Sequence, residues 1–90
     1  MNYEWDESKR ALNLHNHGVD FMAVHGFMWE WALITPDLHA EYGEARFMAV
    51  SFIGDDLFTL VYANRGESIR VISLRQSTNE EKRLYAKDTQ

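Results

Sequence analysis

The chain has 90 residues, of which 46% are hydrophobic and 26% are charged, and its formal net charge is −5 at neutral pH. This length predicts one domain spanning residues 1–90, and the composition excludes the disordered class. The absence of cysteine excludes disulfides, thiolate metal sites and cysteine nucleophiles, and it fits a reducing compartment. The N-terminus is acidic and polar, and no apolar run reaches about 18 residues. These features together predict a cytoplasmic chain without a signal peptide or membrane span.

The first predicted elements are a short extended segment, 2–5, and a helix over about 7–16 that lacks Gly, Pro and β-branched residues. Asp6 suits the N-cap because its carboxylate can accept hydrogen bonds from the free amides of the first turn. Gly18 stands where a left-handed C-cap is needed. Three polar side chains follow one another at i, i+4 spacing and predict a polar stripe on this helix: Lys9, Asn13 and His17.

A second helix is predicted to follow directly, with Asp20 as its N-cap. The helical pattern weakens at Gly26, and the aromatic-rich segment 27–34 fits either a continued helix or a strand. Pro36 ends either element. The polar segment 37–45 is predicted to be a loop.

Three strands are predicted next, at 46–53, 57–64 and 69–75. The breaks between them, 54–56 and 65–68, are short and contain glycine, as antiparallel hairpins require. Strict alternation along the last strand predicts two faces. One face would carry Ile69, Val71, Ser73 and Arg75, and the other Arg70, Ile72 and Leu74.

Thr78 or Asn79 is predicted to cap a final helix that runs through 80–85. The order of elements indicates an α+β fold. It comprises two N-terminal helices, an antiparallel meander of three to four strands, and a C-terminal helix.

Several short motifs occur along the chain, and each lies at the boundary of a predicted element. They are EWDESK at 4–9, Asn13, HGVDF at 17–21, GEAR at 43–46, and IRVISLR at 69–75 followed by Thr78, Glu81 and Tyr85. This ordered set resembles the BrnT family of toxins over almost the whole chain. Asn16, Leu74 and Ser77 depart from the family pattern, which usually has a lysine, a small residue and an alanine there.

The resemblance implies a RelE-like fold and the toxin of a type II toxin–antitoxin pair. It implies an endoribonuclease that a protein antitoxin, BrnA-like and DNA-binding, neutralises by covering the arginine-bearing side of the sheet. Cleavage through the RNA 2′-hydroxyl requires a base, an acid and cations but in principle no metal. The histidines are too scattered to suggest a metal cluster, so we expect neither a metal nor a cofactor.

Arg75 is the first catalytic candidate, because a guanidinium at a strand end can hold a phosphate bidentately. The alternative is an ion pair with Glu80 or Glu81. Arg46 is a second candidate, with a local salt bridge to Glu44 as its alternative.

His17 can transfer protons near neutral pH or cap its helix, and Tyr85 can transfer a proton or pack. Four further residues are candidates for RNA contacts, with a solvated helix face or a structural ion pair as the alternative: Lys9, Asn13, Arg70 and Lys82.

Two rival hypotheses stay open. The chain can be a catalytically degenerate relative that acts as a protein-binding module, which Asn16 and the negative charge favour. It can also be an interaction domain unrelated to RNA that binds a protein through the aromatic segment 27–31. A homodimer and a toxin–antitoxin heterotetramer are both compatible with the sequence.

Overall fold

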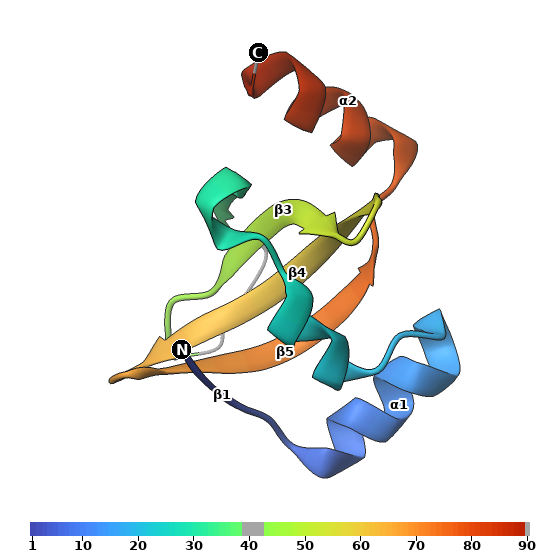
Figure 1. Cartoon of the computed structure of the whole chain (residues 1–90). Helices are drawn as coiled ribbons and strands as arrows, with labels where there is room; N and C mark the ends of the chain where they lie inside the picture. The colour runs from blue at the N-terminus through green and yellow to red at the C-terminus, as the bar shows by residue number, and fades with distance from the viewer. Residues whose placement is uncertain (39–42, 90) are drawn as a thin grey trace.

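The computed structural model describes residues 1–38 and 43–89. They form one five-stranded sheet with two α-helices and two short 3₁₀ helices (Figure 1). The helices are α1 (Glu7–His17), η1 (Phe21–Gly26), η2 (Trp29–Trp31) and α2 (Asn79–Asp88), and the strands are β1 (Asn2–Glu4), β2 (Leu33–Pro36), β3 (Phe47–Ile53), β4 (Asp56–Arg65) and β5 (Ser68–Gln76).

The strand order is β1-β5-β4-β3-β2. The predicted α+β fold and the antiparallel meander of β3, β4 and β5 are confirmed. The number and direction of strands were predicted wrongly, because β1 pairs with β5 in parallel and β2 adds a fifth strand beside β3. Both additions are edge strands of three and four residues, too short for periodicity to reveal their partners.

The first helix, α1, is confirmed together with both of its caps. The Asp6 carboxylate accepts hydrogen bonds from the amides of Ser8 (2.8 Å) and Lys9 (3.2 Å). Gly18 has a φ of 70° and donates its amide hydrogen to the carbonyl of Leu14. Only glycine adopts this left-handed conformation readily, so the chain turns out of the helix at that residue.

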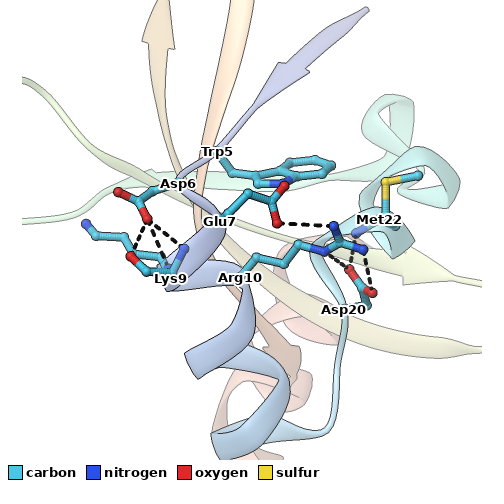
Figure 2. A network of polar contacts seen from close by, with 8 residues as sticks. Trp5, Asp6, Glu7, Lys9, Arg10, Asp20 and Met22 are labelled. Carbon is cyan, nitrogen blue, oxygen red and sulfur yellow. Dashed lines mark hydrogen bonds and ion pairs between the residues drawn. The ribbon is translucent and has the colours of Figure 1, made fainter.

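The second predicted helix is a 3₁₀ helix, η1, and so the expectation of an α-helix there was wrong. Its predicted N-cap, Asp20, accepts a hydrogen bond from the amide of Met22. The Asp20 carboxylate also binds Arg10 of α1 at 2.8 and 3.0 Å, as Figure 2 shows. The short helix is therefore tied to α1 by an ion pair as well as by packing.

The undecided segment after Gly26 divides into η2 and the edge strand β2. The loop predicted at 37–45 falls partly on 39–42, outside the described residues. At the C-terminus, Thr78 caps α2, and a capping box links its side chain and backbone to Glu81.

The hydrophobic core lies between η1 and one face of the sheet. Its buried members are Phe21, Val24, Phe27, Ala49, Leu60, Tyr62, Val71 and Leu74. The opposite face of the sheet is free of η1, and α2 lies near one end of it (Figure 1).

Candidate active site

A β-bulge in β5 decides which of its side chains share a face. Val61 pairs with Ser73, but the next residue of β4, Tyr62, pairs with Val71, so Ile72 is an extra residue. Val71 and Leu74 therefore both point into the core and are buried. The strict alternation predicted for this strand is wrong, because a bulge shifts the phase by one residue.

The shift brings Arg70 and Arg75 to the same face of the sheet. Arg70 pairs with Ala63, and Arg75 pairs with Thr59, both on the side opposite the core. Arg46 directly precedes β3, and alternation from Phe47, whose partner Tyr62 belongs to the core, turns Arg46 to this same side. We call this surface the arginine face, and it carries Arg46, Arg70 and Arg75 around Thr59, Val61, Ala63 and Ser73.

Arg75 is held by a carboxylate from α2. Its Nη1 and Nη2 donate to the two carboxylate oxygens of Glu81 at 2.7 and 2.9 Å, and Nη1 also reaches the carbonyl of Gln76 at 3.3 Å. The Arg75 guanidinium lowers the pKa of Glu81 to about 2, with further hydrogen bonds from Thr78 and Thr59 acting in the same direction. Of the two predicted ionic partners, the structure selects Glu81.

The other two arginines also lie near carboxylates. Arg70 donates to Glu4 of β1 at 3.2 Å. Glu44 forms a two-pronged ion pair with Arg65 at 2.9 and 3.0 Å. This pair lowers the pKa of Glu44, and the charges of Arg46 and Arg70 lower it further. Glu44 is therefore within the electrostatic reach of three arginines, from β4, from β5 and from the residue before β3.

A hollow of about 210 Å³ opens beside the arginine face, between α1 and β5. Lys9 and His17 line it on the helix side, and Ser73 lines it on the strand side. Because Ser73 also belongs to the arginine face, the hollow and the arginine face adjoin at that residue. The predicted site residues thus form two groups: Lys9 and His17 line the hollow, and Arg46, Arg70 and Arg75 lie on the arginine face.

Asn13 also lines the hollow, but its predicted place on a solvated stripe is wrong. The side chain is only 6% exposed. Its amide nitrogen donates to the carbonyls of Val19 (2.9 Å) and Leu74 (2.7 Å), and its oxygen accepts from the amide of Leu74 (3.2 Å). These bonds use its donors within the fold and leave it no hydrogen to donate to RNA.

The two candidates on α2 have different surroundings. The Tyr85 hydroxyl donates to the carbonyl of Trp31 at 2.8 Å, and its ring packs edge-on against Phe52. Its surroundings match the packing alternative. Lys82 is exposed on α2.

Thr59 contributes to this site, although it was not predicted from the sequence. Its hydroxyl donates to Glu81 at 2.9 Å and lies 2.8 Å from the hydroxyl of Ser77. Thr59 gives no signal of its own, because a threonine within a strand is ordinary. The spacing of Thr78 and Glu81 does match a capping box and marks Glu81 as a residue with a fixed position.

Within 1–38 and 43–89, no three His, Asp or Glu side chains are grouped so that they could hold a metal ion. In the same ranges, none of the helices has the length and apolarity to cross a membrane.

Comparisons with known proteins agree on one family. The family described as "Ribonuclease toxin, BrnT, of type II toxin-antitoxin system" matches residues 5–81. The crystal structure of the ribonuclease toxin BrnT of Brucella abortus is similar, with a TM-score of 0.68 and 28% identity over 88% of this chain and 99% of that one. No curated protein sequence matches the chain.

Proposed function

The chain belongs to the BrnT family of ribonuclease toxins of type II toxin–antitoxin systems, and from this premise we propose that it cleaves RNA on the arginine face. The observation that carries the proposal is the position of Arg46, Arg70 and Arg75 on one face of the sheet. Guanidinium groups gathered on one face suit the phosphates of a single RNA strand, because arginine binds phosphate through paired N–H groups.

We assign the chemistry to the substrate's own 2′-hydroxyl, without a metal. The 2′-oxygen attacks the adjacent phosphorus, its proton passes to a base, and the bond from phosphorus to the 5′-oxygen breaks as that oxygen receives a proton. The products are a 2′,3′-cyclic phosphate and a free 5′-hydroxyl. His17 is our candidate for proton transfer, with Lys9 beside it in the same hollow. Arg75 and Arg70 would stabilise the charge that develops on the phosphate oxygens.

The family implies a protein antitoxin, and we propose that it is a DNA-binding, BrnA-like protein that covers the arginine face. Such a partner would exclude RNA from the arginines by occupying their donors. We further propose that the pair acts in the cytoplasm. A homodimer and a toxin–antitoxin heterotetramer remain alternatives for its assembly.

A second candidate function is that of a degenerate relative that binds antitoxin but does not cut RNA. The ion pairs of Arg75 with Glu81 and of Arg70 with Glu4 favour it, because carboxylates already occupy part of each guanidinium. Asn16 in the hollow beside Lys9 and His17 favours it too, since an asparagine supplies no positive charge.

The experiment is RNA cleavage by the purified chain, free of antitoxin and in the presence of a metal chelator. We expect cleavage by the native chain and its loss in Arg75→Ala, with Arg83→Ala as the matched control because Arg83 is an exposed arginine of α2. Induced expression in a bacterial host should arrest growth in the same pattern. A folded native chain that leaves RNA intact would contradict the ribonuclease function and support the degenerate binding module.

A further inference from the structure

We propose that Glu81 is a positioning residue, which holds one edge of the Arg75 guanidinium so that its other edge faces an RNA phosphate. The inference rests on the proposed ribonuclease function and adds to it a specific orientation of the phosphate on Arg75.

A guanidinium has five N–H groups in a rigid plane and can form two separate two-pronged contacts. Glu81 binds the terminal edge of the Arg75 guanidinium, since its two oxygens accept hydrogen bonds from Nη1 and Nη2. The carbonyl of Gln76 accepts a hydrogen bond from the other N–H of Nη1. Within 1–38 and 43–89, the Nε of Arg75 donates no hydrogen bond. The side edge, formed by Nε and the second hydrogen of Nη2, is therefore available.

Glu81 is itself held from several directions. One carboxylate oxygen accepts from the Thr59 hydroxyl at 2.9 Å, from the Thr78 amide at 2.8 Å and from Arg75. Thr59 is fully buried in β4, and the Thr78 contact is part of the capping box of α2. The carboxylate therefore joins a central strand, the start of α2 and the arginine at one point.

These contacts argue against Glu81 as a competitor that RNA must displace. Releasing its carboxylate would break the capping box, leave the buried Thr59 hydroxyl with one partner fewer and separate a bidentate ion pair. Each loss costs free energy, which a phosphate on the same edge of Arg75 would have to supply. A phosphate on the side edge needs none of these changes, and the Arg75 side chain keeps 27% of its surface exposed.

For catalysis, the main effect of Glu81 is to fix the orientation of the Arg75 guanidinium. An arginine on a strand end has several rotatable bonds, and the carboxylate restricts it to one orientation before RNA binds. Preorganised charge of this kind acts mainly on the transition state. The proposal therefore predicts that loss of the Glu81 charge lowers kcat more than it raises KM.

The first test is the variant Glu81→Gln, with Glu80→Gln as its matched control. Glutamine keeps the length needed for the capping box and can accept from Thr59, but it cannot form the two-pronged ion pair. We expect kcat for RNA cleavage to fall about a hundredfold in Glu81→Gln, with little change in KM. Glu80→Gln removes the same charge from an exposed neighbouring position and should leave both constants unchanged. An increase in activity in Glu81→Gln would overturn the proposal.

The second test uses the native chain and does not depend on catalysis. The probe is inorganic phosphate, followed by NMR of the Arg75 Nε–H signal and the Glu81 carboxyl carbon signal. We expect phosphate to shift the Nε–H signal while the Glu81 signal stays in place. Movement of the Glu81 signal with phosphate means that the carboxylate is displaced, and it would contradict the proposal.

The two tests separate the two hypotheses. A native chain that does not cut RNA contradicts the proposed function, whereas the NMR result still tests the orientation of Arg75. If Glu81→Gln fails to fold, the measurement on the native chain remains decisive for the positioning role.

Discussion

Asn13 closes the free edge of a strand with a single side chain. β1 covers β5 only from Ser68 to Arg70, so the outward amide and carbonyl of Leu74 have no strand beside them. The Asn13 amide bonds to both groups, and a further bond reaches the carbonyl of Val19. One helix residue thus satisfies backbone groups that a sixth strand would otherwise have to pair with.

Replacing Asn13 by alanine should therefore destabilise the fold. Buried donors and acceptors that lose their partners cost about 1–3 kcal/mol each, so we expect a loss of roughly 2–4 kcal/mol. The measurement is the urea midpoint of unfolding. Asn16→Ala, at an exposed position of the same helix, is the control and should change stability little. Equal effects of the two substitutions would contradict this role for Asn13.

Glu81 should make stability depend on acidity in a defined range. Its pKa falls from an ordinary 4.5 to about 2 in the folded chain, mainly because of Arg75. A lowered folded pKa gives stability that is complete above about 4.5 and disappears as the pH falls towards 2. We expect on the order of 1–3 kcal/mol from this group at neutral pH.

The check is urea unfolding of the native chain and Glu81→Gln at several pH values. The difference between them should be largest at neutral pH and should shrink between about pH 4.5 and 2. Other carboxylates with lowered pKa values, such as Asp20, affect both proteins alike and cancel. A difference that does not change with pH would exclude the ionised carboxylate as its source.

At the scale of elements, the ends of the helices are defined by local chemistry. α1 begins at the Asp6 carboxylate and ends at Gly18, and α2 begins with a capping box at Thr78. β5, in contrast, gains its bulge from its neighbours. Val71 and Leu74 are three residues apart, and both can enter the core only if Ile72 is left out of the pairing.

Gly18→Ala should destabilise the chain by about 1 kcal/mol. No atom lies near the added Cβ, so the cost comes only from the positive φ of 70°. Gly26→Ala is the matched control, because its Cβ would meet Ile53 at an ordinary contact distance of 3.4 Å. Thermal unfolding of both variants compares the two sites. A larger loss at Gly26 than at Gly18 would contradict the argument from backbone conformation.

At the scale of the whole molecule, a chain with a net charge of −5 gathers three arginines on one face. Nearby carboxylates balance two of these arginines when no ligand is bound, through the pairs Arg70–Glu4 and Arg75–Glu81. The negative charge elsewhere weakens the long-range attraction of RNA. Binding must then depend on a few close contacts and not on a wide basic surface.

The salt dependence of RNA binding should reflect this small number of contacts. If three arginines each neutralise one phosphate of a single strand, the logarithm of the affinity should fall with the logarithm of salt at a slope of about −2. A non-cleavable RNA lacking the reactive 2′-hydroxyl allows this measurement at equilibrium. Arg70→Ala should reduce the slope by about 0.7, and Arg83→Ala should leave it unchanged. A much steeper slope would indicate a wider cationic surface than the arginine face.

The sequence alone determined the elements whose signals are local. The caps of α1 and α2, the glycine-bearing hairpins and the β3–β4–β5 meander depend on residues close together in the chain. The same is true of the ordered motifs that indicated the BrnT family. Each of these signals acts within a few residues, so no knowledge of distant contacts is needed to interpret it.

The tertiary structure decided the parts that depend on residues far apart in sequence. Only packing against β4 reveals the bulge at Ile72, which joins Arg70 to Arg75 on one face and corrects the split predicted by alternation. Asn13 looked like a solvated residue because its partner Leu74 is 61 residues away. At both positions, hydrogen bonds and burial between distant segments overrode local periodicity. The grouping of the arginines therefore follows from the pairing of the strands and could not be predicted from the sequence.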